Sequence, residues 1–277
     1  MPLLECNGAQ IFYESTGEGA QTIVFAHGLL WSGEMWAAQV AEFSPRYRCV
    51  TFDFRGQGKT PVSADGYGMD ALAGDAAALI ETLGVGPVHF AGLSMGGFIA
   101  MRLAARRPEL IRSLLLLDTS AEAEAPEKVP QYRLLGFIGR RLGYGLVASQ
   151  VMPIMFGRTF MRDPARKQER DEWRARLIAN DRVGIERALA GVIGRDGIED
   201  ELPKITAPTL VIVGDEDVAT VPAKAERIRE LIPGAKLVVI PRAGHSSTIE
   251  EPAAVNAAIA AFLAEVAAPA GTSEVRS

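Results

Sequence analysis

Five consecutive residues, Gly92-Leu93-Ser94-Met95-Gly96, place a serine between two glycines at a spacing that suits nucleophilic chemistry. The short apolar run Val88–Ala91 before them is typical of a strand, and Met95–Arg106 after them is typical of a helix. A serine on the sharp turn between strand and helix is exposed, and small neighbours let the two elements approach closely. The helix N-terminus also favours negative charge developing beside the serine. A glycine-rich turn without chemistry is the plainer interpretation, but this position between strand and helix predicts that Ser94 is a nucleophile.

A serine nucleophile needs a base, for which histidine is the usual choice. The chain has three histidines, His27, His89 and His245. His245 follows the last predicted strand in a loop, and loops at the carboxyl ends of strands carry side chains toward such a site. His89 falls inside a predicted strand and His27 stands beside Gly28, so structural roles are expected for both. The sequence predicts His245 as the base, with an ordinary loop histidine as the alternative.

The base in turn needs a carboxylate to orient it. Asp217 lies a few residues into the loop that follows the predicted strand Leu210–Val213, facing the expected position of His245. Asp215 is closer to that strand and is expected to bond loop backbone. Asp118 ends the predicted strand Ser113–Leu117 and is a rival, because a carboxylate there also reaches the histidine. We predict Asp217 as the acid and keep Asp118 as the alternative.

Two backbone N–H groups are expected to stabilise the oxyanion that forms during acyl transfer. One belongs to Met95, the residue after the nucleophile. The second comes from the loop after an early strand, where Gly28 allows unusual backbone angles and Leu29 can point its N–H inward, with Leu30 as the alternative. Asp53 and Arg55, in the later Asp53–Gly58 turn, are expected to brace their own loop.

The elements that must position these residues alternate along the chain. Asn7-Gly8 predicts a hairpin turn at the start, and short runs rich in Val, Ile and Leu then alternate with helical stretches. This order predicts an α/β fold with a doubly wound, mostly parallel sheet. The expected strands are 3–6, 9–14, 22–26, 48–52, 88–91, 113–117, 210–213 and 237–240, and the expected helices outside the insertion are 69–83, 95–106, 223–231 and 252–266.

One long segment interrupts this alternation. Residues 119–203 contain no convincing strand and predict a helical cap inserted between two strands, including a helix from Asp163-Pro164 to Asn180. The α/β core is then expected to comprise residues 1–118 and 204–266, and residues 267–277 are expected to form a disordered tail.

Apolar residues of this cap, together with the loop near Trp31, are candidates for a substrate pocket. The alternative is that they pack the cap onto the core. Residues 128–182 carry 12 basic and 5 acidic side chains, which would attract an anionic substrate or form a solvated helix face. The candidate pocket residues are Leu30, Trp31, Phe137, Met152, Ile154, Met155, Phe156 and Phe160.

Composition narrows the classes of function. The 277 residues carry a net charge of −5, which argues against a general nucleic-acid binder. The two cysteines fit no metal-binding or disulfide pattern, so no metal and no cofactor is expected. No signal peptide or membrane span is apparent, which predicts a cytoplasmic protein; monomer and homo-oligomer both stay open.

Together these residues resemble the α/β-hydrolase superfamily over roughly Thr22 to Leu263. The nearest subgroups are small bacterial arylesterases, cofactor-free haloperoxidases (perhydrolases) and 3-oxoadipate enol-lactonases, whereas haloalkane dehalogenases and epoxide hydrolases use aspartate in place of Ser94. The landmarks that match in order are His27-Gly28 with Trp36, Asp53-x-Arg55-Gly56-x-Gly58, Gly92–Gly97, Gly214-x-x-Asp217 and Gly244-His245.

The resemblance implies an ester or lactone hydrolase that acts through an acyl-enzyme on Ser94, with Asp217 and His245 completing the triad. It implies a small, largely apolar ester or lactone as the partner molecule. A C–C hydrolase or perhydrolase with the same triad is the enzymatic alternative. A hydrolase-fold binding protein without turnover is the remote one, because binding alone does not demand all three residues.

Overall fold

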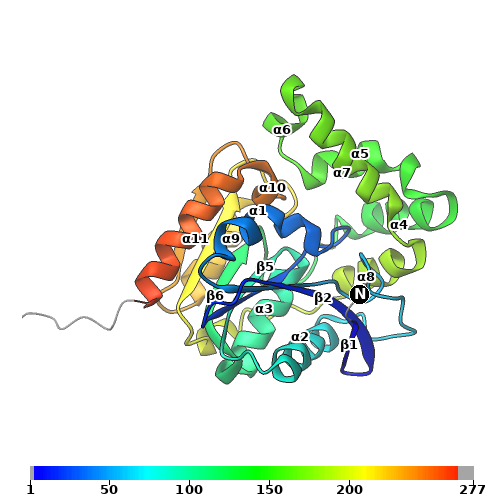
Figure 1. Cartoon of the computed structure of the whole chain (residues 1–277). Helices are drawn as coiled ribbons and strands as arrows, with labels where there is room; N and C mark the ends of the chain where they lie inside the picture. Colours follow the sequence, from blue (N-terminus) through cyan, green and yellow to red (C-terminus); the bar gives the residue numbers. More distant parts are fainter. Residues whose placement is uncertain (1–2, 268–277) are drawn as a thin grey trace, which may run out of the picture.

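The computed structural model describes residues 3–267, and within that range the strands form one eight-stranded sheet (Figure 1). Its order is β1-β2-β4-β3-β5-β6-β7-β8, with antiparallel pairing at β1–β2 and β2–β4 and parallel pairing from β4 onward. The predicted doubly wound, mostly parallel α/β fold is therefore confirmed. The strands are β1 (Leu3–Cys6), β2 (Ala9–Thr16), β3 (Thr22–Ala26), β4 (Arg48–Phe52), β5 (Val88–Leu93), β6 (Ile111–Leu117), β7 (Thr209–Gly214) and β8 (Lys236–Ile240).

Helices cover both faces of this sheet, which is why its central strands are apolar throughout. On β6, Leu114 and Leu116 belong to one hydrophobic cluster and Leu115 and Leu117 to the other, because successive side chains point to opposite faces. Figure 1 shows α2 and α3 on one side and α1 and α11 on the other. The helices flanking the sheet are α1 (Ala37–Phe43), α2 (Met69–Leu83), α3 (Met95–Arg106), α9 (Pro222–Leu231), α10 (Ser247–Glu250) and α11 (Pro252–Ala267).

The sequence located these elements closely. The helices predicted at 69–83 and 95–106 have the bounds of α2 and α3, and α11 extends one residue beyond its prediction to Ala267. β2 continues two residues beyond its predicted end because Ser15 and Thr16 pair with Val50 and Cys49 of β4. The predicted disordered tail lies outside the described residues, apart from Ala267. None of the helices within residues 3–267 is long and apolar enough to cross a membrane.

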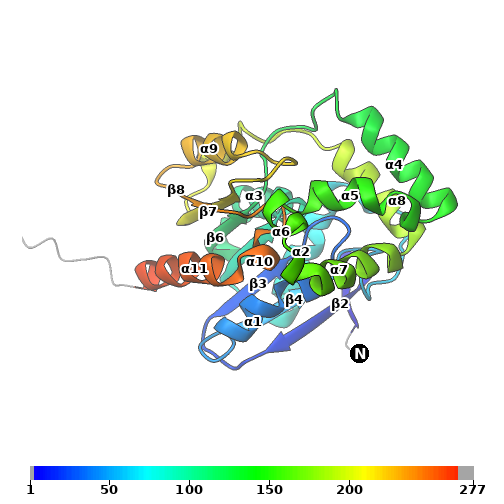
Figure 2. The ribbon, with the colours of Figure 1, turned by 90° about the horizontal axis from the view of Figure 1, so that it is seen from above.

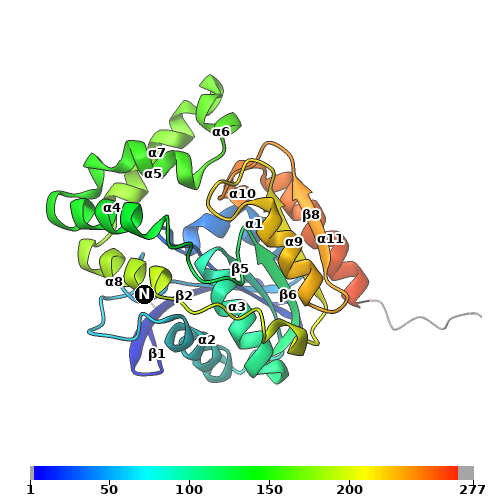
Figure 3. The same cartoon turned by 180° about the vertical axis from the view of Figure 1, so that it is seen from behind.

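A helical insert lies between β6 and β7, as predicted, and covers the carboxyl ends of the strands (Figures 2 and 3). The helix expected from Asp163 to Asn180 is divided: a 3-10 turn at Pro164–Arg166 precedes the α-helix. The precise limits of the insert as a domain, 119–203, stay a prediction. Here "the insert" means α4 (Val129–Leu142), α5 (Ala148–Met155), α6 (Arg158–Arg162), α7 (Lys167–Ala179), α8 (Arg182–Ile193) and the loops that join them.

Two glycine pairs bring the backbone of the insert directly against the backbone of the core. A Cβ on Gly184 of α8 would lie 1.9 Å from the carbonyl oxygen of Gly56. A Cβ on Gly244, beside His245, would lie 2.1 Å from the backbone nitrogen of Gly157. Any side chain at these positions would separate the insert from the core.

Candidate active site

Ser94 occupies the sharp turn between β5 and α3, with the strained backbone angles that such a turn requires. Its φ is 51° and its ψ is −112°, a conformation that non-glycine residues rarely adopt. A Cβ on Gly92 would lie 2.3 Å from the carbonyl oxygen of Gly96, and a Cβ on Gly96 would lie 2.2 Å from that of Ala26. The two glycines are therefore sterically required, as the sequence predicted.

The structure brings Ser94, His245 and Asp217 into one hydrogen-bonded chain. The Oγ of Ser94 lies 2.8 Å from Nε2 of His245, and Nδ1 of His245 lies 2.9 Å from Oδ2 of Asp217. All three side chains are buried. The carboxylate fixes the imidazole so that Nε2 faces the hydroxyl and can accept its proton.

The loop after β7 holds the Asp217 carboxylate by hydrogen bonds from its own backbone and a nearby hydroxyl. Oδ1 accepts from the N–H groups of Ala219 and Thr220, and Oδ2 accepts from the hydroxyl of Thr220. That hydroxyl also lies 3.2 Å from Nδ1 of His245. The sequence analysis missed Thr220, although an aspartate that bonds the backbone N–H two residues on, as Asp217 bonds Ala219, is a known turn signal.

The charges around His245 oppose the effect of its burial. Burial alone lowers the pKa of the imidazole, but the charge and hydrogen bond of Asp217, with smaller contributions from Asp118 and Glu250, raise it above its ordinary value. Burial likewise works to raise the pKa of Asp217, yet its bonds to His245 and Thr220 hold it below the ordinary range. The arrangement stabilises an imidazolium beside a carboxylate.

Asp118, the alternative acid, lies next to the triad, but within residues 3–267 it makes no hydrogen bond to His245. It has a φ of 44°, its Oδ1 accepts from the Gly214 N–H, and its Oδ2 accepts from the Ser247 hydroxyl at 2.5 Å. Complete burial and the nearby Asp217 raise its pKa to about 7. Asp118 thus ties β6 to the loops that carry Asp217 and His245.

Glu250, which the sequence did not indicate, braces the His245 loop against the insert. Its carboxylate accepts hydrogen bonds from the N–H groups of Gly157 at 2.8 Å and Ser246 at 3.2 Å. Burial raises its pKa to about 7. The histidine loop and the insert therefore share one buried carboxyl group.

The geometry separates the two candidates for the second oxyanion donor. The Leu30 N–H donates to Oε1 of Gln57 at 3.0 Å and is therefore occupied. Among the hydrogen bonds between described residues, none uses the N–H of Leu29 or of Met95. Leu29 lines the same cavity as Ser94. These contacts favour Leu29 over Leu30.

The remaining polar residues weighed from the sequence have structural contacts. The imidazole of His27 accepts from the Phe54 N–H at 3.0 Å, and His89 lies 2.7 Å from the Ser113 hydroxyl; burial lowers the pKa of both, that of His89 to about 4. Asp215 accepts from the Arg242 N–H at 2.7 Å. Asp53 and Arg55 brace their loop, Asp53 by bonding the Gly33 and Lys59 N–H groups and Arg55 by pairing with Asp75.

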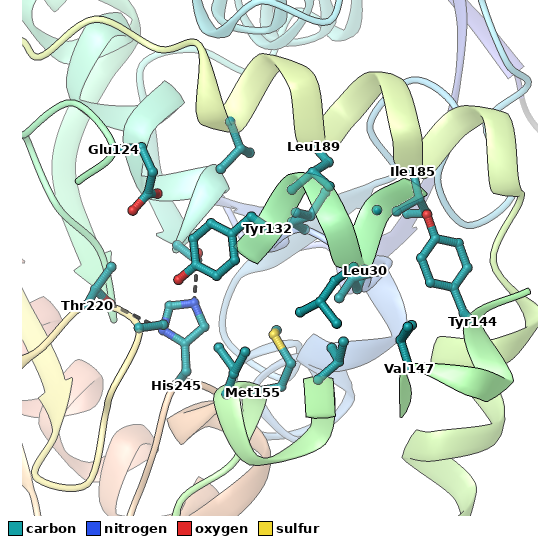
Figure 4. Close-up of a pocket in the computed structure, with 18 of the residues that line it drawn as sticks. Leu30, Glu124, Tyr132, Tyr144, Val147, Met155, Ile185, Leu189, Thr220 and His245 are labelled. Carbon is teal, nitrogen blue, oxygen red and sulfur yellow. Dashed lines mark hydrogen bonds between the residues drawn. The ribbon is translucent and has the colours of Figure 1, made fainter. Parts of the chain in front are cut away.

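A cavity of about 120 Å³ opens beside Ser94 and His245 (Figure 4). Figure 4 shows His245 and Thr220 at one end and Tyr144 and Val147 at the other, with aliphatic side chains between them. The core side of the cavity consists of Leu29, Leu30, Ser94, Phe98, Ala219, Thr220 and His245. The insert side consists of Glu124, which precedes α4, with Tyr132, Leu135, Gly136, Tyr144, Val147, Val151, Ile154, Met155, Ile185, Leu189 and Val192.

Three of the predicted pocket residues, Leu30, Ile154 and Met155, line this cavity. Phe137 does not: its side chain is 60% exposed on the outer side of α4, because the cavity face of that helix is formed by Tyr132, Leu135 and Gly136.

Four further predicted contacts are also absent from the cavity wall. Trp31, Met152, Phe156 and Phe160 are buried in the hydrophobic cluster between insert and core, where Phe156 and Phe160 stack at 4.6 Å. Trp31 donates from its indole to the Ser246 hydroxyl and so supports the histidine loop. These four residues serve packing, the alternative weighed above. Glu124, Tyr132 and Tyr144 line the cavity instead and carry no motif that would have revealed them.

Within residues 3–267, no group of three or more His, Cys, Asp and Glu side chains is arranged to hold a metal ion.

The fold and this strand–turn–helix site define a hydrolase-type α/β protein. The sequence matches the family model described as alpha/beta hydrolase fold over residues 21–252, so the chain belongs to the alpha/beta hydrolase family.

Relatives within this family have several names. A thermophilic esterase from Thermogutta terrifontis is 32% identical, with a TM-score of 0.86 and coverage of 93% of this chain and 94% of that one. The enol-lactonase from Burkholderia xenovorans is 30% identical, with a TM-score of 0.88 and coverage of 95% and 100%. A Mycobacterium tuberculosis protein named "Putative non-heme bromoperoxidase BpoC" is 32% identical, with coverage of 92% and 98%. Esterase, lactonase and peroxidase names thus all occur among proteins similar to this chain.

Proposed function

We propose that this protein is a serine hydrolase that cleaves uncharged carboxylic esters or lactones through an acyl-enzyme on Ser94. The observation that carries the proposal is the chain from the Ser94 Oγ to His245 Nε2 at 2.8 Å and from His245 Nδ1 to Asp217 at 2.9 Å. A buried serine that faces an oriented imidazole is suited to nucleophilic attack. The esterase and enol-lactonase similar to this chain support the same reaction class.

In the first half of the reaction, the Ser94 Oγ attacks the substrate carbonyl carbon while its proton passes to Nε2 of His245. The carbonyl oxygen becomes an oxyanion, to which the N–H groups of Leu29 and Met95 donate. The bond from carbon to the leaving oxygen then breaks, and the proton on Nε2 passes to that oxygen. In a lactone the leaving oxygen stays attached to the acyl group.

In the second half, water attacks the acyl carbon and gives its proton to Nε2. The ester bond to Ser94 breaks, the proton returns to Oγ, and the carboxylic acid leaves. The Asp217 carboxylate stays ionised throughout and stabilises the imidazolium in both halves.

The cavity supports an uncharged acyl group. Apart from His245, the ionisable residues that line it are Glu124 and two tyrosines, and no Lys or Arg is among the lining residues. Oε2 of Glu124 pairs with the Arg195 guanidinium at 2.8 Å, so this charge is compensated within the protein. A substrate carboxylate would find no cationic partner among the lining residues, so its burial there would carry a high desolvation cost.

Several basic side chains of the insert, which raised the possibility of an anionic substrate, have partners within the protein. Arg158 pairs with Glu216, Arg140 with Glu186 and Arg176 with Glu34. Arg166 donates to the carbonyl oxygens of Ile249 and Glu250. These four arginines therefore pair on the surface of the insert or bind the insert to the core, and none of them lines the cavity.

The test combines turnover of p-nitrophenyl esters, from acetate to decanoate, with labelling by a fluorophosphonate. We expect hydrolysis that stops when one equivalent of the reagent is bound, with the label located on Ser94 by peptide mass spectrometry. Labelling without ester turnover would favour C–C bond hydrolysis or peroxide chemistry with the same residues. Absence of both would favour a binding protein without turnover.

A second arm tests the charge argument with one γ-lactone that carries a side-chain carboxylate and with its methyl ester. We expect the lactone ring of the methyl ester to open at least about 10-fold faster than that of the acid. Burying one unpaired carboxylate in an apolar site costs enough free energy to lower the rate by more than a factor of ten. Faster opening of the lactone acid would instead support an enol-lactone acid as the substrate.

A further inference from the structure

Leu30 adopts a backbone conformation that a leucine rarely adopts. Its φ is 73°, in the left-handed region where a Cβ is crowded, and it directly follows the proposed oxyanion donor Leu29. A non-glycine residue persists there only when its surroundings hold it. The contacts of the Leu30 backbone show what holds it.

From the core, Gln57 holds the N–H of Leu30. Its side-chain oxygen accepts this N–H at 3.0 Å, and Gln57 is itself 1% exposed in the loop after β4. That loop is fixed by backbone bonds from the Gln57 N–H to Phe54 and from the Thr60 N–H to Gln57. The other side-chain atom, Nε2, is buried without a hydrogen-bond partner among residues 3–267. The Gln57 amide is therefore oriented to accept from Leu30 through Oε1, although this leaves its Nε2 without a partner.

From the insert, Asn180 holds the carbonyl oxygen of Leu30. Its Nδ2 donates to that oxygen at 2.9 Å, and it also lies 3.1 Å from the carbonyl oxygen of Leu177, near the end of α7. One residue of the loop after β3 is therefore held on its N–H by the core and on its C=O by the insert.

We propose that Gln57 and Asn180 are positioning residues that together fix Leu30, and thereby keep the preceding N–H, that of Leu29, directed toward the oxyanion. The proposal rests on the proposed hydrolase function. The insert then completes the oxyanion hole as well as covering the substrate, so the reaction runs at full rate only when α7 is docked on the loop after β3.

Gln57 is tested by two substitutions of similar size. Gln57→Met removes the acceptor, and Gln57→Glu retains an oxygen at the same reach. We expect Gln57→Met to lower kcat by about 10- to 100-fold, a part of the effect of deleting an oxyanion donor outright. Gln57→Glu should recover most of that loss, with little change in KM for either variant.

Asn180 is tested against a control that joins the same two segments of the chain. Asn180→Ala should lower kcat by about 10-fold, because displaced catalytic groups lose rate steeply with distance. Glu34→Gln removes the exposed ion pair from Arg176 of α7 to Glu34 of the 3-10 turn Gly33–Trp36. It leaves Leu30 untouched and should retain the wild-type kcat.

Three readouts separate positioning from stability. The kcat is normalised to the Ser94 sites titrated by fluorophosphonate, which removes any unfolded fraction. Affinity for a trifluoromethyl ketone, whose serine adduct carries an oxyanion, should fall in parallel with kcat/KM, whereas affinity for the product acid should not change. The double variant Gln57→Met/Asn180→Ala should lose less than the product of the single losses, because both act on one residue.

Failure of the positioning role can be distinguished from failure of the proposed hydrolase function. Wild-type turnover with unchanged kcat per titrated site in both single variants, or a lower Tm as their only effect, would overturn the positioning role and leave the hydrolase intact. Absence of wild-type turnover and labelling would overturn both.

Discussion

The two sides of the cavity are built on different principles. The core side carries the polar chain from Ser94 to Asp217, and strained backbone at Ser94 and Asp118 holds side chains and loops in place. The insert side presents mainly aliphatic surface from α4, α5 and α8, with Glu124, Tyr132 and Tyr144 as its polar exceptions. In the proposed reaction the core side supplies the reacting groups, whereas the aliphatic wall of the insert shapes the space for the substrate.

The difference shows in how each side tolerates change. A chain of hydrogen bonds fails when one atom is lost, because the partners act as a unit. An apolar wall changes its shape by degrees, and each methylene there alters discrimination only modestly. Loss of a group in the chain from Ser94 to Asp217 should therefore lower turnover of all substrates steeply, whereas substitutions in the aliphatic wall of the insert should reorder the substrates.

The largest effect is expected for Ser94→Ala. Without the hydroxyl there is no acyl-enzyme, and kcat should fall by about 10⁶-fold, the scale found when a triad serine is removed elsewhere. Fluorophosphonate labelling should also disappear, and circular dichroism should show an intact fold. The exposed Ser149→Ala is the control; a Ser94→Ala enzyme near the wild-type rate would remove the distinction between the two sides.

The next effect separates the two buried aspartates. Asp217→Asn should lower kcat by about 10⁴-fold, because an amide cannot hold the imidazole in the required tautomer. Asp118→Asn should cost less than about 10-fold in rate, since Asp118 bonds Gly214 and Ser247 rather than the imidazole. Steady-state kinetics on one ester ranks the two, and the opposite order would place the acid at the end of β6.

On the insert side, opposite changes at Ile154 should move acyl preference in opposite directions. Ile154→Phe fills the cavity and should lower kcat/KM for decanoate relative to butyrate by about 10-fold, whereas Ile154→Ala should raise that ratio. Phe137→Ala, on the outer side of α4, is the matched control and should leave the ratio unchanged. A shift caused by Phe137→Ala would mean that the outer face of α4 also contacts substrate.

The smallest effect is a shift along the pH axis. His245 must be neutral to accept the Ser94 proton, so kcat/KM falls as pH decreases through the pKa of His245. Asp217 holds that pKa above its ordinary value despite burial, which places the acidic limb of the profile at higher pH than for a free histidine. Asp217→Asn removes the largest charge that raises the pKa of His245 and leaves its burial, so the residual activity should have an acidic limb at lower pH. If the acidic limb of the kcat/KM profile did not shift in this variant, a group other than His245 would be responsible for it.

The residues of the core side can be predicted from the sequence because their requirements are local. A strand, a sharp turn and a helix must follow one another around Ser94, and this order is visible in a few residues. The choice between Asp217 and Asp118 was harder, because both follow strands at the same edge of the sheet. Only the placement of the side chains distinguishes the carboxylate that bonds His245 from the one that bonds Ser247.

The insert side was located poorly because its requirements are not local. Phe137 and Phe156 have the same apolar side chain, yet Phe137 is exposed whereas Phe156 is buried between insert and core. Gln57 and Asn180 are 123 positions apart and meet on opposite sides of one leucine residue. Contacts between segments far apart in the chain produce no local spacing pattern, so a single sequence does not reveal them.

The glycine pairs Gly56–Gly184 and Gly157–Gly244 set a condition on exchanging caps between members of this family. Because backbone meets backbone at both junctions, no flexible side chain can absorb an error in placement. A cap taken from another enzyme would fit this core only if it had glycine at the positions of Gly157 and Gly184, which meet the core backbone. Chimeric designs are therefore best screened first at these two junctions, before any residue that faces substrate is considered.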